Sequence, residues 1–416
     1  MEPKIRIKGF QREWKELAFS DSFDSLKNNS LSRAELSESG SVYNIHYGDV
    51  LISYNECVEV DKEVKTFVKD AEFARKLKQS CAIKNGDIIF ADAAEDNTVG
   101  KCTEVIAQEA DAIVSGLHTI PCRPKKEFAS RYLGYYLNSN AFHDQLLPHI
   151  QGTKISSISK RALAQTYISY PSDKNEQQAI ASYFQHLDSL IQSTTKKIES
   201  LKQVKAASLQ SMFPQEGETK PRVRFMGFEG EWEKVSLNDI LEERNEKSRK
   251  TLEYPLMAFI AYKGVAPKGE RYDRSALVND VENKIYKKTE YGDFIYSSNN
   301  LETGSIGLNS YGKATISPVY SIFRCKDMID FNFIGRRLIC RDIINEMIKW
   351  RQGVIYGQWR IHEKDFLTIN ILLPSYQEQT KIGDYFTNLD TQISLQTQRL
   401  EKLKQIKSAC LDNMFI

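Results

Sequence analysis

One stretch of 38 residues occurs twice in this chain. It reads EQQAIASYFQHLDSLIQSTTKKIESLKQVKAASLQSMF at residues 176–213 and EQTKIGDYFTNLDTQISLQTQRLEKLKQIKSACLDNMF at residues 378–415. The copies stay 202 residues apart along their whole length, and 18 of the 38 positions are identical. Two unrelated helices that share only a hydrophobic pattern would not agree so often, so the repeat indicates an internal duplication.

Apolar residues in both copies recur at intervals that alternate between four and three, which is the pattern of a coiled-coil seam. They are Ile180, Phe184, Leu187, Ile191, Ile198, Leu201 and Val204 in the first copy, and Ile382, Phe386, Leu389, Ile393, Leu400, Leu403 and Ile406 in the second. Each copy is predicted to form a helix of about 57 Å that pairs with the other copy. Asp173 and Ser375 lie three residues before Glu176 and Glu378, which is the spacing of a capping box.

The similarity between the two halves extends beyond the helices. RIKGFQREW at residues 6–14 returns as RFMGFEGEW at residues 224–232, GDIIF at 86–90 as GDFIY at 292–296, and QG at 151–152 as QG at 352–353. We therefore predict an α+β fold in which each of two domains precedes a long helix. The predicted boundaries are a domain at 1–172, a helix at 173–213, a linker at 214–221, a domain at 222–374 and a helix at 375–416.

Each domain is predicted to mix short strands and helices. In the first half, strands are expected at 42–47 and 49–53 around a turn at Gly48, at residue 83, and at 87–91, 112–114, 119–122 and 167–170. One helix is expected at 130–145, with its counterpart at 331–350, and a loop at 151–159.

Composition limits the class of protein. The chain has 416 residues and a net charge of +2, so any nucleic-acid binding must come from local basic patches. It lacks both an apolar run of about 18 residues and an apolar signal core, so we expect a cytoplasmic protein without a membrane span. None of the seven cysteines forms a C-x-x-C pair, which argues against a zinc site.

Motifs for catalysis are missing. The sequence contains neither H-E-x-x-H nor G-x-S-x-G. Residues 307–313 fit G-x-x-x-x-G-K, but Ala314 follows where a P-loop needs Ser or Thr, and 315–323 has the pattern of a strand. We therefore expect a Gly-rich strand connection there, and a chain that is not an enzyme on its own and holds no cofactor or metal.

Polar loops carry side chains that suit DNA. Arg, Lys, Gln and Asn can bond to base edges, and Ser and Thr can bond to phosphates, although a polar loop is more often only solvated. Trp359 is interpreted as packing at the edge of a core. The candidate DNA-binding residues are Tyr43, His46, Lys101, His118, Gln151, Thr153, Lys154, Ser156, Ser157, Lys160, Lys263, Asn299, Asn300, Tyr320, Gln352, Tyr356, Gln358 and Arg360.

The duplicated motifs resemble those of the specificity subunit of type I restriction-modification systems. The residues that carry the resemblance are Glu176, Gln177, Ile180, Tyr183, Phe184, Leu187 and Asp188, their counterparts Glu378, Gln379, Ile382, Tyr385, Phe386, Leu389 and Asp390, the L-K-Q-x-K runs, the Met-Phe ends, and G-F-x-x-x-W at 9–14 and 227–232. The resemblance implies two target recognition domains, each of which reads one half of a split site in double-stranded DNA. It also implies helices that act as a spacer and dock two modification subunits.

The resemblance further implies that the modification subunits carry S-adenosylmethionine and the adenine methylation chemistry, and that the restriction subunits use ATP and magnesium. An antiparallel helix pair is expected, because it would place the two recognition domains at opposite ends and suit half-sites about 34–36 Å apart. Because the domains differ in sequence, the target should be asymmetric. Lys202, Lys205, Lys404 and Lys407 are expected to face outward and to be candidates for docking the modification subunits. The alternative is a coiled-coil scaffold whose variable domains bind protein partners.

Overall fold

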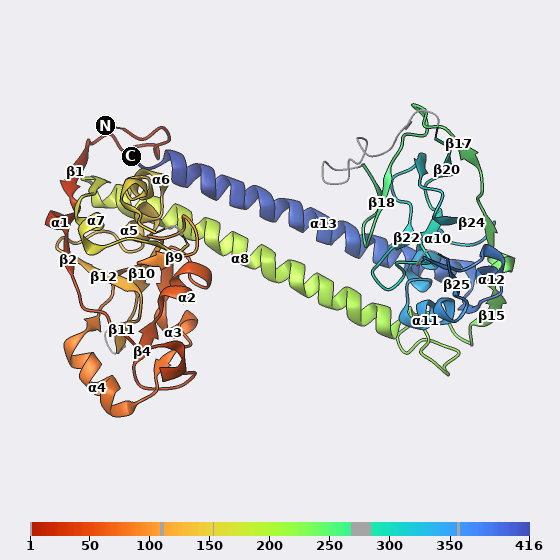
Figure 1. The fold of residues 1–416 in the computed structure, drawn as a ribbon, viewed down its shortest axis with the longest axis horizontal. Helices are drawn as coiled ribbons and strands as arrows, with labels where there is room; N and C mark the ends of the chain where they lie inside the picture. The colour runs from red at the N-terminus through yellow and green to blue at the C-terminus, as the bar shows by residue number, and fades with distance from the viewer. Residues whose placement is uncertain (1, 109–111, 153, 268–283, 356–357) are drawn as a thin grey trace. The chain divides into compact units, whose positions relative to one another are not determined.

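The structure is a computed structural model that describes residues 2–108, 112–152, 154–267, 284–355 and 358–416. The chain divides into two compact units, and both long helices contribute to each of them (Figure 1). Unit 1 comprises Met1–Thr195 and Gln398–Ile416, and unit 2 comprises Lys196–Thr397. The predicted long helices are α8 (Lys174–Ser211) and α13 (Tyr376–Asn413). Each unit therefore contains the start of one long helix and the end of the other.

Unit 1 is built on two five-stranded sheets. The first has the order β2 (Phe23–Ser25), β12 (Thr119–Pro124), β8 (Ile88–Ala91), β10 (Cys102–Ile106) and β5 (Cys57–Glu59). The second has the order β3 (Leu36–Ser37), β6 (Phe67–Val68), β4 (Tyr43–Ile45), β11 (Ile113–Ser115) and β7 (Ala82–Ile83). Two further pairs are β1 (Trp14–Ala18) with β14 (Tyr167–Pro171), and β9 (Ala93–Ala94) with β13 (Ser156–Ser157). The short helices are α1 (Phe19–Ser22), α2 (Tyr47–Ile52), α3 (Val60–Glu63), α4 (Ala71–Ser80), α5 (Tyr132–Leu137), α6 (Asn140–His143) and α7 (Lys160–Ala164), with 3-10 turns at Arg33–Glu35 and Leu147–His149.

Unit 2 repeats the main sheet, with four strands among its described residues. Its largest sheet has the order β16 (Leu241–Glu243), β24 (Ser321–Cys325), β21 (Phe294–Tyr296) and β22 (Ile306–Leu308). A second sheet has the order β17 (Lys247–Ser248), β20 (Tyr286–Thr289) and β23 (Ala314–Ile316). The strand pairs are β15 (Glu233–Ser236) with β27 (Asn370–Leu373), β18 (Ala258–Ile260) with β19 (Gly264–Ala266), and β25 (Gln352–Ile355) with β26 (Gln358–Arg360). The short helices are α9 (Leu237–Ile240), α10 (Phe331–Arg337), α11 (Arg341–Lys349) and α12 (Glu363–Leu367).

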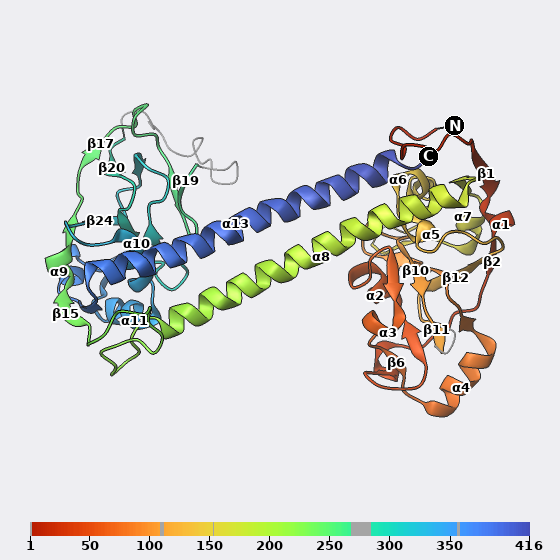
Figure 2. The same ribbon diagram turned by 180° about the vertical axis from the view of Figure 1, so that it is seen from behind.

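The long helices run antiparallel, as the contacts inside unit 1 show. There the start of α8 lies against the end of α13. The Tyr183 hydroxyl is 3.5 Å from the Cys410 sulfur, and the Phe184 and Phe415 rings stack with centroids 5.7 Å apart. The chain ends also meet in unit 1, because the Ile5 amide donates to the Asn413 carbonyl at 2.9 Å (Figure 2).

Unit 2 makes the same contacts with the helices exchanged. Ser208, near the end of α8, is 2.9 Å from the Tyr385 hydroxyl near the start of α13. The Phe213 and Phe386 rings stack with centroids 6.0 Å apart. The antiparallel pairing and the internal pseudo-two-fold duplication that the sequence predicts are therefore confirmed.

The start of each long helix is held by an arginine from the entry motif. Arg6 makes two hydrogen bonds to the Glu176 carboxylate, at 2.7 and 2.9 Å, and Arg224 makes two to Glu378, both at 2.7 Å. Both glutamates are fully buried. The predicted capping boxes are therefore incomplete, because these carboxylates bind arginine instead of the backbone of the capping residue.

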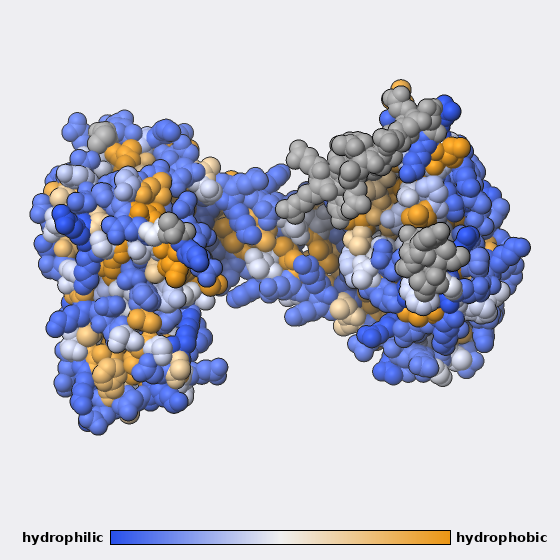
Figure 3. Space-filling model, in the orientation of Figure 1, coloured by the Kyte–Doolittle hydropathy of each residue, from blue (hydrophilic) through white to orange (hydrophobic). Residues whose placement is uncertain are grey.

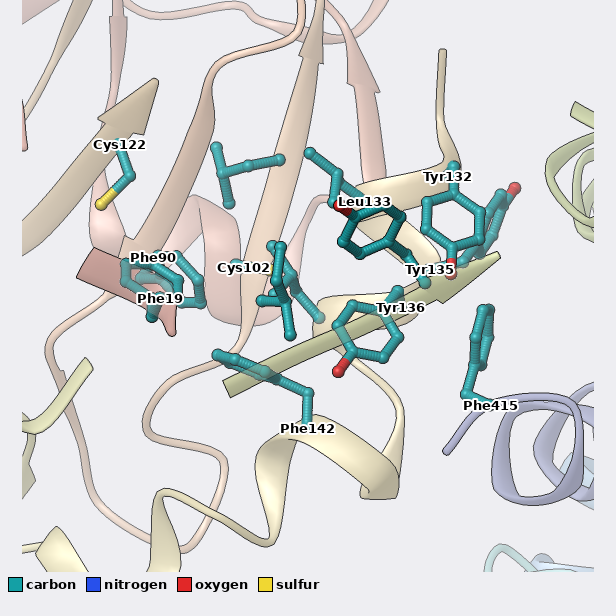
Figure 4. Close-up of a cluster of buried hydrophobic side chains, with 14 of the residues drawn as sticks. Phe19, Phe90, Cys102, Cys122, Tyr132, Leu133, Tyr135, Tyr136, Phe142 and Phe415 are labelled. Atoms are coloured by element: carbon teal, nitrogen blue, oxygen red, sulfur yellow. The ribbon is translucent and has the colours of Figure 1, made fainter. Parts of the chain in front are cut away.

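The end of each long helix completes the core of a unit. Phe415 packs edge-on against Tyr132 and Tyr136 of α5, and it is 4% exposed (Figure 4). Phe213 packs edge-on against Trp232 and at a tilt against Phe333 of α10. The Met-Phe sequence that both copies share is thus buried in the core of each unit.

Some local predictions were wrong. Residues 49–53 do not form a strand, because 49–52 belong to helix α2 and Ser53 is its C-cap residue. The first turn of α2 is capped by the His46 ring nitrogen, which accepts from the Gly48 amide at 3.2 Å. The helix predicted at 130–145 is broken at Ser139 into α5 and α6, and its counterpart is likewise broken into α10 and α11. Periodicity alone does not reveal such breaks, since both pieces contribute to the same apolar face.

The seam and the lysines of the helices also differ in part from expectation. Val204 and Ile406 are 46% and 45% exposed. Lys205 and Lys407 do not face outward, because each is paired with an aspartate of the other helix. The Lys205 and Asp390 side chains are 2.5 Å apart, and those of Lys407 and Asp188 are 2.6 Å apart.

On the surface, hydrophilic side chains cover most of each unit in the face shown in Figure 3, with separate hydrophobic patches.

Within the described residues, none of the helices is long and apolar enough to cross a membrane.

Candidate nucleic-acid interface

Both units carry a β-hairpin at the repeated Gln-Gly sequence. In unit 1, Gln151 and Ser157 exchange two backbone hydrogen bonds, at 3.0 and 2.8 Å. In unit 2, Gln352 pairs with Arg360 in the same way within β25 and β26. We call residues 151–157 and 352–360 the recognition hairpins. The duplication has therefore preserved strand pairing at the Gln-Gly sequence, while the unit 2 pairing is irregular and spans a longer segment.

Each recognition hairpin is anchored to the loop that follows the central strand of the sheet. In unit 1, β13 pairs with β9, which follows β8, and the Ile158 amide donates to the Asp92 carbonyl at 2.9 Å. In unit 2, the loop after β21 holds the hairpin with side chains. Asn299 accepts from the Trp359 amide at 2.5 Å, and Ser298 accepts from the Ile361 amide at 3.0 Å.

The unit 1 hairpin lies beside a cluster of aromatic and histidine side chains. The His118 ring is 3.1 Å from the Asp92 carboxylate and edge-on to Tyr47, with centroids 5.2 Å apart. His118 has a φ of 52° in the left-handed region and is about half exposed. Since Asp92 contacts both His118 and the backbone of Ile158, the structure brings His118 and the hairpin together.

Other candidates of unit 1 are engaged inside the unit. The Lys101 ammonium donates to the carbonyls of Leu51 and Tyr54, each at 2.9 Å, and burial lowers its pKa. His46 is 6% exposed, and burial is the main cause of its lowered pKa. Neither side chain is free to reach DNA in this arrangement, so their predicted DNA contacts remain predictions without structural support.

The remaining candidates of unit 1 are more accessible. Lys154 is exposed on the hairpin, and Ser156 and Ser157 are half-buried in β13. Lys160 is exposed, and its ammonium donates to the Leu26 carbonyl at 3.1 Å. Tyr43 lies away from the hairpin and packs on Phe67, with ring centroids 4.6 Å apart. Thr153 lies outside the described residues.

In unit 2, most of the candidates gather at the hairpin. Arg360 is 66% exposed and lies 3.7 Å from Glu363, and Gln352 donates to Asp365 at 3.0 Å. Asn300 is exposed in the anchoring loop. Asn299 is committed to that anchor, Gln358 begins β26, and Tyr356 lies outside the described residues.

Two candidates of unit 2 lie on the neighbouring β18–β19 hairpin or against it. Lys263 is exposed at the turn of that hairpin. The Tyr320 hydroxyl donates to the Phe259 carbonyl at 3.4 Å, and its ring packs on Phe259. Tyr320 is therefore part of the packing of β18, while Lys263 remains accessible.

Sequence reasoning missed three side chains at these surfaces. Trp359, which is not among the candidate residues, is 44% exposed on the unit 2 hairpin. Tyr47 and Asp92 complete the His118 cluster. The Gln-Trp-Arg sequence at 358–360 was a usable signal for Trp359, whereas the contacts of Tyr47 and Asp92 are tertiary.

The Gly-rich segment at 307–313 is a connection between strands, as the sequence predicts. Its amides are already bonded, because the Asn309 side chain accepts from the amides of Tyr311 and Gly312 at 2.9 and 3.1 Å. Strand β23 begins at Ala314, where a phosphate-binding loop would lead into a helix. Within the described ranges, none of the His, Cys, Asp and Glu side chains form a group of three or more that could hold a metal ion.

Comparison with known proteins identifies the family to which this sequence is similar. The sequence matches the family described as "Type I restriction modification DNA specificity domain" twice, at residues 11–203 and 229–405. A protein of Methanocaldococcus jannaschii described as the MjaX specificity subunit of a type I restriction enzyme is 22% identical over 370 residues, which cover 85% of this chain and 84% of that protein.

Two solved structures share the fold. The type I restriction-modification S subunit from M. genitalium aligns with a TM-score of 0.62 and 16% identity, over 100% of this chain and 99% of that one. A chain from a structure of the assembly and conformational transition of a type I restriction-modification system aligns with a TM-score of 0.53 and 16% identity, over 98% and 99%.

Proposed function

This chain belongs to the type I restriction-modification DNA specificity family and carries two of its domains, and from that premise we propose that the two domains read the two different halves of one split DNA target. In this proposal, residues 1–172 and 222–374 are the target recognition domains, 173–213 and 375–416 are spacer helices, and 214–221 is the linker between the halves. The target is asymmetric, because the two domains differ in sequence.

The paired recognition hairpins support this proposal most directly. They have equivalent positions and anchors in the two units, but unit 1 presents Lys154 and two serines where unit 2 presents Trp359 and Arg360. An equivalent place in the fold with different side chains is what two readers of different base sequences need, since base edges are distinguished by hydrogen bonds and apolar contacts of side chains.

The exposed groups suggest how each half is read. Arg360 can make paired hydrogen bonds to a guanine, and Asn300 to an adenine. Lys154 can neutralise a phosphate. His118, whose other ring nitrogen is fixed by Asp92, can bond to a base edge in unit 1.

Partner subunits supply the chemistry. Two modification subunits would carry S-adenosylmethionine and methylate adenines, and restriction subunits with ATP and magnesium would complete the complex. The chain itself is non-catalytic and holds none of these cofactors. Lys202 and Lys404 are exposed on the helices and are the lysines that remain available for docking the modification subunits.

Mapping of methylated adenines tests the proposal. The chain and its modification subunit are expressed together in a host without other adenine methyltransferases, and the genome is sequenced for N6-methyladenine. We expect one split, asymmetric motif that disappears when this chain is omitted. A symmetric motif would contradict the assignment of different half-sites, and the absence of any motif tied to this chain would favour the scaffold alternative.

A further inference from the structure

A pocket of about 840 Å³ lies in unit 2 between the β18–β19 hairpin, β22, α10, α11 and the first half of α13. Its walls combine charged side chains with apolar ones. The charged lining residues are Lys205, Lys263, Arg336, Asp390 and Glu302, of which Glu302 is paired with Arg351, and the apolar ones include Ile339, Leu308 and Leu395. None of the described residues of the unit 2 recognition hairpin lines this pocket, although Lys263, a candidate DNA-binding residue on the β18–β19 hairpin, does.

The charged wall carries excess positive charge. Asp390 binds Lys205 through one carboxylate oxygen, at 2.5 Å, and Arg336 through the other. The Arg336 Nε is buried and has no hydrogen-bond partner among the described residues. Lys205 and Arg336 share the Asp390 carboxylate, so a second carboxylate beside them would balance the charge.

Unit 1 provides that second carboxylate at the equivalent place. Lys407, the counterpart of Lys205, lies between Asp188 and Glu56, with its ammonium 2.6 Å from each carboxylate. Burial lowers the pKa of Lys407, but the two facing carboxylates outweigh this effect and raise it overall. Unit 1 therefore has one cation with two carboxylates at this place, whereas the described part of unit 2 has two cations with one.

Glu56 lies on an extended segment of the chain. It directly precedes β5, which adds to the sheet as a parallel neighbour of β10, and its carbonyl accepts from the Glu104 amide at 2.9 Å. In the described part of unit 2, the corresponding sheet ends at β22, one wall of the pocket. The Leu308 side chain covers Gly335 there, so an incoming segment would run beside Lys205 and Arg336 and not over that glycine.

We propose that this pocket binds an extended, acidic segment of a partner protein, whose Glu or Asp carboxylate lies between Lys205 and Arg336 as Glu56 lies beside Lys407. The pocket rim suits a peptide better than a small anion. Tyr262, Tyr291 and Leu395 line it and are 84%, 62% and 57% exposed, which offers apolar contacts to the residues that flank the carboxylate. This assignment does not depend on which DNA sequence the chain reads.

A peptide copied from unit 1 tests the proposal. The probe is a fluorescent peptide with the sequence of residues 51–60, with Ser in place of Cys57, and its binding to the full chain is measured by fluorescence anisotropy. We expect saturable binding of one peptide per chain. Gln in place of Glu56 in the peptide should weaken binding about tenfold, because a charge-assisted hydrogen bond is lost.

Two protein variants locate the binding. Arg336→Gln should weaken binding of the Glu56 peptide about tenfold, and it should remove the difference between the Glu and Gln peptides. Leu395→Glu places a repelling carboxylate at an exposed position on the rim and should also weaken binding of the peptide. This variant tests the pocket even if Arg336→Gln fails to fold. The matched control is Arg324→Gln, which alters an exposed arginine of unit 2 paired with Glu242 and should leave peptide binding unchanged.

Three results would overturn the proposal. The first is the absence of saturable peptide binding, and the second is equal binding of the Glu and Gln peptides. The third is binding of inorganic phosphate that depends on Arg336 without any binding of the peptide, which would assign the pocket to a phosphate.

Discussion

At the scale of single residues, the buried pair of Glu176 and Arg6 is the contact most sensitive to substitution. We expect Glu176→Gln to lower the free energy of unfolding of unit 1 by about 3 kcal/mol, because it leaves a partly buried guanidinium without its charge partner. Urea unfolding measures the change. The matched control Glu242→Gln breaks an exposed ion pair of unit 2 and should cost much less, because solvent screens that pair. Equal costs for the two variants would contradict this role of the buried pair.

Glu104 gives unit 1 a pH dependence. Its carboxylate is 3% exposed and accepts from the amides of Arg131 and Gly134 at 2.6 and 2.9 Å. Burial raises its pKa from 4.5 to about 7 in spite of these bonds. Between these two values the unfolded state has lost the proton while the folded state keeps it, so the stability of unit 1 falls as pH rises from about 4.5 to 7.

We therefore expect unit 1 to lose about 3 kcal/mol of stability through Glu104 across this pH range. Urea unfolding at pH 4.5, 6 and 7.5 should show that the Glu104→Gln variant lacks this part of the loss. A difference between wild type and variant that is constant with pH would show that Glu104 does not titrate there.

The recognition hairpins predict effects on DNA binding. In the complex assembled with modification subunits, Lys154→Ala and Arg360→Ala should each weaken binding and reduce the slope of log K against log[salt] by about 1, because one phosphate or base contact with a cation is lost. Arg324→Ala is the control, since this exposed arginine lies on β24 in an ion pair. Unchanged affinity and salt slope in both hairpin variants would show that the hairpins do not contact DNA.

At the scale of elements, the ends of the long helices matter more than their middles. Phe415→Ala should destabilise unit 1 by about 3–5 kcal/mol, because the ring is buried against α5 although it is the second-last residue of the chain. Ile406→Ala, on the same helix and 45% exposed, should cost less than about 1 kcal/mol. Thermal unfolding of the two variants compares them directly, and similar losses would contradict the idea that the helix end belongs to the core.

Some of these elements could be predicted from the sequence, and others could not. The long helices were predictable because a repeated seam of apolar residues specifies both a helix and its partner. The helix α2 was not, because its six residues are too few to show a helical period, and its cap comes from a histidine side chain. The bonds of Arg6 to Glu176 were also missed, since the two residues are 170 positions apart and only the fold brings them together.

The candidate site was predictable only in outline. The repeated Gln-Gly pair located both recognition hairpins, because the duplication preserved it. The sequence could not show that Lys101 bonds to two carbonyls inside unit 1 or that Asp92 connects His118 to the hairpin, since these contacts depend on loops that differ between the two halves.

At the scale of the whole molecule, the chain contains two units with a similar set of internal contacts. The contacts of each unit have counterparts in the other, including the arginine at the helix start, the paired tyrosine and the stacked phenylalanines. The differences are concentrated in the recognition hairpins, their neighbouring loops and the pocket beside Lys205. We therefore expect that each domain can be changed without altering what the other one recognises.

Exchange of one domain tests this central claim most directly. Residues 20–170 are replaced by the corresponding residues of a family member with a different target, and methylated adenines are mapped in a host that also expresses the modification subunit. We predict that one half of the split motif changes while the other half and the spacing between them stay the same. A change in both halves, or in neither, would contradict the claim that each domain reads its own half of the target.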